Sequence, residues 1–267
     1  MLHMCVHILT GEMLASVMHC VWKSGTQCLK ILKALHHTNK MMNMTFNEAG
    51  VYVMSMDTSK TSLVKLVLRA SEFEAYTCDE PITLGLYSEV LLNVMQKVKK
   101  NTLVWSASND AQLVISFVQN NQKTQFSIRT IAIDTDELAI PELEDDAALQ
   151  VPREVVQDWL DKMLMTKGDV RFIVSDTQFQ CESNSLELGT VQYSEPVGTD
   201  RVLVKAFRQG VDMRLSFYAT KSLAVFSATG GDTCFLGLSN QQPSRVKVSL
   251  GDESYLCLYV APKIIDD

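Results

Sequence analysis

Few of the side chains that could carry out chemistry stand at the spacing that a reaction needs. His3, Cys5 and His7 could ligate a metal from an extended segment, but no fourth ligand lies nearby in the sequence. His36 and His37 lie among lysines rather than carboxylates, which favours exposed imidazoles over a pair of metal ligands. The patterns G-x-x-x-x-G-K-[ST], H-E-x-x-H and G-x-S-x-G do not occur. We therefore expect no enzymatic activity, no metal site and no cofactor.

Carboxylates concentrate in one stretch, residues 129–146, which we call the connector and which reads RTIAIDTDELAIPELEDD. After Arg129 it holds no basic residue, and Pro141 both disfavours helix before it and removes a strand donor. Composition alone favours an exposed acidic linker between two domains. The alternative is a linker whose apolar side chains dock on another surface. The chain has 31 acidic and 24 basic residues, so the connector's acids account for its whole net charge of −7.

The composition indicates a folded chain of one large or two ordinary domains, with 46% hydrophobic and 21% charged residues over 267 positions. Its seven cysteines are scattered without a C-x-x-C pair, which predicts mostly buried thiols in a reducing compartment. No apolar run approaches the roughly 20 residues of a membrane span, so we expect no membrane partner. Residues 1–16 lack the positive start of a secretory signal and are interpreted as an N-terminal extension.

A helix followed by strands around a polar turn recurs four times along the chain. The helices are expected to begin near residues 26, 87, 153 and 219, at a nearly constant spacing. The pattern predicts an α+β fold with two similar domains, residues 17–128 and 147–267, each with two helices packed on antiparallel sheet. Such sheets leave unpaired edges, and head-to-tail joining of edges gives a closed ring.

Three stretches carry a resemblance to a known family: residues 55–69 around Ser55-Met56-Asp57, residues 138–142 (LAIPE) and residues 261–264 (APKI). With residues 76–79 they resemble the eukaryotic sliding clamp, proliferating cell nuclear antigen, over residues 17–267. The resemblance implies the DNA-clamp fold and a non-enzymatic homotrimeric ring that encircles duplex DNA without reading its sequence. It also implies DNA polymerase, repair proteins and a clamp loader as partners. The expected location is the nucleus, or a viral replication compartment if a virus encodes the chain.

Sliding on DNA requires basic side chains on the helices, because phosphate contacts hold the duplex without base readout. Two departures from the family weaken this surface: Asn93 and Gln96 replace lysines, and Asp158 and Asp161 replace arginines. Each lysine taken alone is better explained as a solvated helix face, whereas the set together favours DNA contact, weaker or differently placed than in the family. The expected DNA-binding residues are Lys30, Lys33, Lys97, Lys99, Lys162 and Lys221.

The resemblance also implies an apolar pocket that captures a short partner motif with a glutamine, an aliphatic residue and two aromatics. Lys60 and Thr61 replace the family's usual His-Val at its rim. Ordinary core or sheet-edge packing is the alternative interpretation, above all for Leu63. The expected pocket residues are Met56, Leu63, Leu138, Ile140, Pro243, Tyr259, Ala261 and Pro262.

Ring closure is expected to join an edge strand near Gln119–Ile128 to Gln178–Ser183 of the next protomer. The residues expected at this interface are Phe126, Ile128, Phe179 and Cys181, and Phe126 could equally pack internally. Two other functions stay open: a monomeric or dimeric processivity factor with the same fold, and a protein-interaction scaffold that does not encircle DNA.

Overall fold

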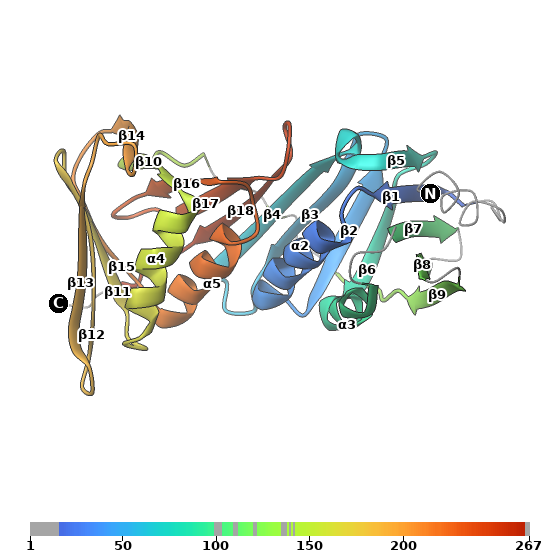
Figure 1. The fold of residues 1–267 in the computed structure, drawn as a ribbon, viewed down its shortest axis with the longest axis horizontal. Helices are drawn as coiled ribbons and strands as arrows, with labels where there is room; N and C mark the ends of the chain where they lie inside the picture. Colours follow the sequence, from blue (N-terminus) through green and yellow to red (C-terminus); the bar gives the residue numbers. More distant parts are fainter. Residues whose placement is uncertain are drawn as a thin grey trace. The chain divides into compact units, whose positions relative to one another are not determined.

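In the computed structural model, the described residues contain four helices, and these form two units with the antiparallel strands that follow them (Figure 1). The structure describes residues 16–98, 103–108, 112–119, 122–134, 138, 140 and 142–264. The first unit contains Met1–Ser55, Lys65–Leu138 and Gly251–Ser254. The second contains Met56–Val64, Ala139–Leu250 and Tyr255–Asp267. The predicted α+β class is therefore confirmed, while residues 1–15, most of the predicted extension, lie outside the described ranges.

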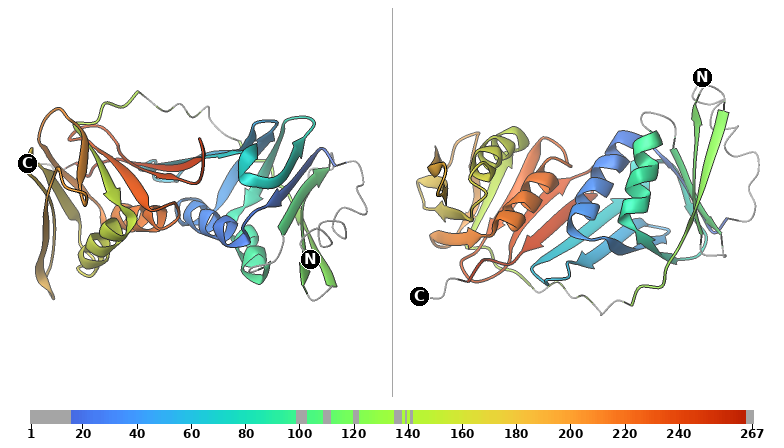
Figure 2. Two further views of the ribbon diagram at one scale, coloured as in Figure 1. Left: turned by 45° about the horizontal axis from the view of Figure 1, so that its top comes forward. Right: turned by 90° about the horizontal axis from the view of Figure 1, so that it is seen from below.

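The helices of the first unit are α2 (Gly25–Thr38) and α3 (Ser88–Val98), which lie side by side (Figure 2). α2 begins where the Ser24 hydroxyl accepts a hydrogen bond from the Gln27 amide at 3.2 Å. Its residues Cys28, Ile31 and Leu35 are buried at helical spacing, which fixes the opposite face toward solvent.

Two runs of antiparallel strands pack against these helices in the first unit. One has the order β5-β1-β7-β8-β9, and the other has the order β4-β3-β2-β6. The edge-to-face contact of Trp22 with Trp105, with ring centroids 5.2 Å apart, lies in the core of the first run. The strands are β1 (Met18–Trp22), β2 (Met41–Asn47), β3 (Gly50–Met56), β4 (Ser62–Arg69), β5 (Phe73–Cys78), β6 (Ile82–Tyr87), β7 (Leu103–Ser108), β8 (Gln112–Gln119) and β9 (Gln122–Arg129), with a 3-10 turn, η1 (Ala70–Glu72), before β5.

The second unit repeats this plan with α4 (Arg153–Leu164) beside α5 (Phe217–Ser227). Its strand orders are β14-β10-β16-β17-β18, continued by the first residues of β4, and β13-β12-β11-β15. Trp159 of α4 packs on Phe172 and Phe179, with ring centroids 5.6 and 5.3 Å away. The strands are β10 (Ala147–Pro152), β11 (Val170–Val174), β12 (Gln178–Ser185), β13 (Gly189–Pro196), β14 (Leu203–Phe207), β15 (Val211–Leu215), β16 (Thr233–Leu238), β17 (Ser244–Ser249) and β18 (Tyr255–Val260).

The cysteines agree with one further prediction for the described part of the chain. Its six cysteines are free thiols, and all except Cys78 are buried. No helix in the described ranges is long and apolar enough to cross a membrane.

Candidate functional site

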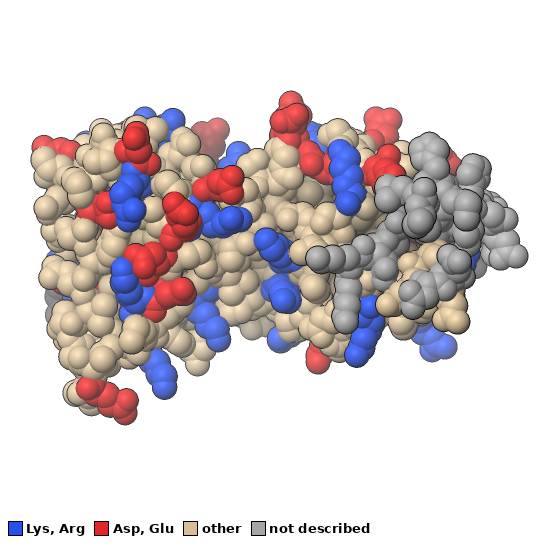
Figure 3. All heavy atoms as spheres, in the orientation of Figure 1, with Lys and Arg blue, Asp and Glu red and all other residues tan. Residues whose placement is uncertain are grey.

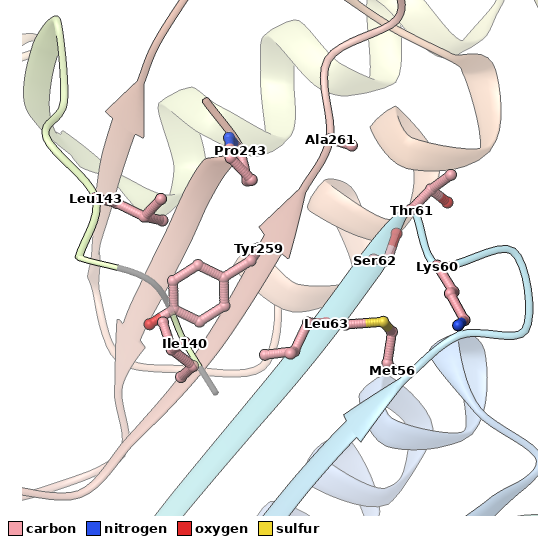
Figure 4. A pocket seen from close by; sticks show the side chains of 10 residues that line it. All are labelled: Met56, Lys60, Thr61, Ser62, Leu63, Ile140, Leu143, Pro243, Tyr259 and Ala261. Atoms are coloured by element: carbon pink, nitrogen blue, oxygen red, sulfur yellow. The ribbon is translucent and has the colours of Figure 1, made fainter. Parts of the chain in front are cut away.

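An apolar pocket of about 220 Å³ opens on the second unit, between the connector and strands β4 and β18 (Figure 4). Six of the eight residues predicted for it do line it, whereas Leu138 and Pro262 do not. Burial raises the pKa of Tyr259, so its hydroxyl is protonated at neutral pH and offers a neutral wall. The lining residues are Met56, Lys60, Thr61, Ser62, Leu63, Ile140, Leu143, Pro243, Tyr259 and Ala261.

Four of these lining residues fall outside the predicted set of eight, and two of them, Lys60 and Thr61, were expected at the rim. Leu143 lies three positions after Ile140 in the connector, and this repeat of an aliphatic residue is the signal that could have identified it. Ser62 carries no such signal. Leu63 is only 8% exposed, so it also packs in the core, as the alternative interpretation expected.

The end of the connector is tied to the second unit by its acids. Asp145 accepts a hydrogen bond from the Arg245 guanidinium at 2.6 Å. Asp146 accepts hydrogen bonds from the Asn240 amide at 2.8 Å and from Gln209 at 2.7 Å. These contacts hold the residues directly after Leu143, so Leu143 stays at the pocket. The connector is thus docked at this end rather than an exposed linker.

The pKa of Asp146 reflects this tethering. Burial by itself raises the pKa of the carboxyl, because a charged group is less well solvated there. Hydrogen bonds from Asn240, Gln209 and Ser239, with the charge of Arg208, favour the ionised form and outweigh burial. The net pKa lies below its ordinary value, so Asp146 is ionised at neutral pH.

The other wall of the pocket begins at a tight turn that Asp57 organises between β3 and β4. One carboxylate oxygen of Asp57 accepts the backbone amides of Thr61 and Ser62, at 2.8 and 2.9 Å. The second oxygen accepts the hydroxyls of Ser59 and Thr61, at 2.5 and 3.0 Å. The Asp57 carboxylate therefore holds the turn. No cluster of three or more potential metal ligands occurs among the residues described.

The basic residues predicted to bind DNA are unequally placed on the helices. Lys30 and Lys33 are exposed on α2, which carries no acid. On α4, Lys162 is paired with Asp158 at 2.6 Å, and Asp161 is exposed beside it. Figure 3 shows acidic side chains among basic ones over α4. Lys97 and Lys221 are exposed on α3 and α5, and Lys99 lies outside the described residues.

The comparisons with known proteins agree on one family. The family model described as "Proliferating cell nuclear antigen, N-terminal domain" matches residues 18–138. The proliferating cell nuclear antigen of Chaetomium thermophilum is 27% identical over 251 residues, which cover 89% of this chain and 95% of that protein. The chain is similar to the proliferating cell nuclear antigen family over most of its length. These matches support a divergent sliding clamp, and sliding clamps are not enzymes.

More distant relatives of the family match over most of their length. A "Probable DNA polymerase sliding clamp 2" of Paramecium bursaria Chlorella virus 1 is 26% identical, covering 84% of this chain and 83% of that protein. "DNA polymerase sliding clamp 1" of Thermococcus kodakarensis is 24% identical, covering 82% and 87%. The crystal structure of the Entamoeba histolytica proliferating cell nuclear antigen shares the fold, with a TM-score of 0.84 at 20% identity. This match covers 93% of this chain and all of that one.

The edges of the described sheets correct one prediction. Among the described strands, β9 pairs only with β8 and so forms a free edge. Phe126 on β9 is half-buried against Phe117, with ring centroids 6.2 Å apart. β12 pairs with β11 on one side and β13 on the other, so Gln178–Ser183 is not a free edge. Ile128, Phe179 and Cys181 are buried within their own units.

The neighbouring strand, β13, is the free edge of this four-stranded sheet beside β12, and sequence reasoning missed it. Val191 and Tyr193 are half-buried and alternate with exposed polar residues, the period of two that marks a strand. The alternation in TVQYSE was the available signal. Phe179 and Cys181 are therefore core residues, because β13 covers the backbone edge on which their predicted role depended.

Proposed function

We propose that the chain is a processivity factor for DNA polymerase that encircles duplex DNA as a homotrimer and tethers replication and repair proteins. The pocket beside the connector is the observation that carries this proposal. It combines a concave apolar surface with the docked end of the connector, which suits capture of short peptides. Relatives named as DNA polymerase sliding clamps support the same role.

The partner motif that fits the pocket places apolar and aromatic side chains on one face of a short helical turn. Tyr259, Pro243 and Ile140 offer apolar walls, and Met56 supplies an adaptable one. DNA polymerase, other proteins with a glutamine and two aromatics, and a clamp loader are the expected partners.

Ring closure uses two of the edge strands, β9 of one protomer and β13 of the next. Because these strands belong to different units, the contact is head-to-tail, and three copies at a fixed rotation close it. Unpaired backbone donors and acceptors on both strands favour such a joint over two exposed edges.

DNA contact falls mainly on α2, where Lys30 and Lys33 have no acidic neighbour on the helix. Phosphate contacts by lysine are independent of sequence and permit sliding. Since Asp158 neutralises Lys162, the helices of the second unit contribute less to this surface. Lys97, Lys99 and Lys221 supplement it.

Two alternatives would keep the fold and change the assembly: a monomeric or dimeric processivity factor, and a scaffold that binds proteins without encircling DNA. Acidic residues on α4 weaken the basic surface that would face DNA, so both alternatives are to be tested. The proposed location is the nucleus, or the viral replication compartment if a virus encodes the chain.

Solution mass and retention on DNA test the proposal together. Light scattering is expected to give three times the 29.9 kDa chain mass. The loaded protein should stay on a nicked circular duplex and leave when the circle is cut. Monomeric mass supports the first alternative, and no retention despite peptide binding supports the second. A labelled consensus peptide should bind wild type and lose affinity with Ile140→Ala and Tyr259→Ala.

A further inference from the structure

The polar part of the pocket rim contains a single charge. Seven of the lining residues are apolar, and two of the other three, Thr61 and Ser62, are neutral. Lys60 is thus the only charged side chain among the described residues that line the pocket. A peptide seated on the apolar walls would meet this ammonium group at one end. Figure 4 places Lys60 beside Met56, across the pocket from Leu143.

The backbone presents Lys60 in a fixed direction. Its φ of +57° lies in the left-handed region, which is uncommon for residues other than glycine. Its amide donates to the Asp57 carbonyl at 3.0 Å, and the Asp57 carboxylate holds the following two amides. This network over-determines the turn, so it can hold a conformation that a free loop would avoid.

The ammonium group of Lys60 is available to an incoming anion. The side chain is exposed, and no described residue forms an ion pair with it. Asp57, the acid within the same turn, already accepts four hydrogen bonds from other groups. A carboxylate from a ligand therefore has little competition at Lys60.

The opposite end of the pocket has the opposite charge. Glu142 and Glu144 flank Leu143 in the connector and are exposed. Glu144 is paired with Arg208, whereas Glu142 has no ion pair among the described residues. A peptide lying between Lys60 and Leu143 therefore meets a positive end and a negative end. A peptide with a negative end at Lys60 and a positive end near Leu143 is attracted at both ends, because opposite charges attract across a few ångströms. A peptide with the reversed charge order is repelled at both ends.

We infer that Lys60 selects partner segments that carry an aspartate or glutamate at the Met56 end of their apolar anchors. This inference rests on the proposed peptide-binding function, and adds to it the charge pattern of the preferred partner. The occupant is a short acidic-ended segment of another protein. Its apolar side chains supply most of the affinity, and Lys60 sets the preference among segments with equal anchors.

Two peptides of identical composition test this preference in the full-length protein. Both carry the same glutamine, aliphatic and aromatic anchors; one has glutamate before the anchors and lysine after them, and the other has these charges exchanged. Because net charge is equal, the protein's overall charge of −7 affects both alike. Fluorescence anisotropy should show one isomer binding about two- to fivefold more tightly, as expected for one exposed ion pair.

Three variants assign the preference to Lys60. Lys60→Gln should bind the two peptide isomers with equal affinity. Lys60→Arg should keep the difference in affinity that wild type shows. Lys205→Gln makes the same change in net charge at an exposed position of β14 that does not line the pocket. It should leave the preference as in wild type. Rising salt should narrow the difference, because exposed charges are screened.

Equal binding of the two isomers by wild type, or a preference that survives in Lys60→Gln, overturns the inference while the pocket function stands. If neither isomer binds, or if Tyr259→Ala binds both as wild type does, the peptide-binding function fails and the selectivity fails with it. Tyr259→Ala therefore separates the two proposals.

Discussion

The Asp145 carboxylate lies 2.6 Å from the Arg245 guanidinium and joins the connector to strand β17. The Asp145 side chain is only 8% exposed, so this pair is far less hydrated than the surface pairs elsewhere in the protein. Arg245 also lies over the Phe235 ring, 5.5 Å from its centroid. The connector's end is thus fixed by a partly buried charge, and Leu143 reaches the pocket because of it.

Gly237 leaves the space that Asp145 occupies. A Cβ at position 237 would lie 2.3 Å from an Asp145 carboxylate oxygen, well inside van der Waals contact. Gly237→Ala should therefore push Asp145 away from Arg245 and weaken consensus-peptide binding several-fold. Loss of the charged hydrogen bond should also lower the free energy of unfolding by about 1–3 kcal/mol.

The matched control for this change is Gly231→Ala. A Cβ there would meet only the Ser249 carbonyl oxygen, at an ordinary 3.7 Å. Peptide affinity and urea unfolding of both variants check the prediction. Wild-type affinity in Gly237→Ala would mean that the pocket does not depend on the position of Asp145.

The helices could be predicted from sequence more completely than the pocket, because helix periodicity is local and the pocket combines distant segments. The amphipathic period is local, so the helix predicted to begin near residue 153 is observed from Arg153 to Leu164. The pocket residues were found by resemblance, because they come from segments far apart in sequence. The resemblance assigned Leu138 to the pocket and missed Leu143, since docking through Asp145 and Arg245 depends on tertiary contacts.

Strand neighbours were the least predictable feature. Gln178–Ser183 was correctly predicted as a strand, but whether a strand lies at an edge depends on what pairs beside it. β13 supplies that neighbour. The ion pair of Lys162 with Asp158, four positions apart on α4, could have been anticipated from i,i+4 spacing.

Substitutions of Phe126 and Phe179 should have different effects, the first on trimer assembly and the second on the stability of the fold. Phe126→Ala on the free edge β9 is expected to shift the protein toward smaller species at low concentration, with little change in chain stability. Phe179→Ala should instead lower the free energy of unfolding by about 3–5 kcal/mol, because Phe179 is 2% exposed between Trp159 and Phe172. Light scattering and urea unfolding measure the two effects. A fully trimeric Phe126→Ala at low concentration would remove it from the joint.

The charges of α2 and α4 should act on DNA retention in opposite directions. Lys30→Glu with Lys33→Glu should shorten retention on nicked circles and flatten its salt dependence, by about 0.9 in log–log slope for each phosphate that the variant no longer neutralises. Asp158→Ala should lengthen retention, because it releases Lys162 from its ion pair. Lys205→Gln on β14 serves as the charge control. Unchanged retention in the α2 double variant would exclude that helix from the DNA path.

Stability in acid should depend on Asp146, whose folded pKa lies below its ordinary value of 3.8. A lowered pKa means that the folded state holds the ionised form more strongly than the unfolded chain does. This stabilisation is complete above about pH 3.8 and disappears as the pH falls through the folded pKa. We expect urea unfolding from pH 7 to 2.5 to give a higher free energy of unfolding for wild type than for Asp146→Asn. This difference should be constant near neutral pH and should disappear only in strong acid. A margin that persists at the lowest pH would mean that Asp146 acts through packing rather than through its charge.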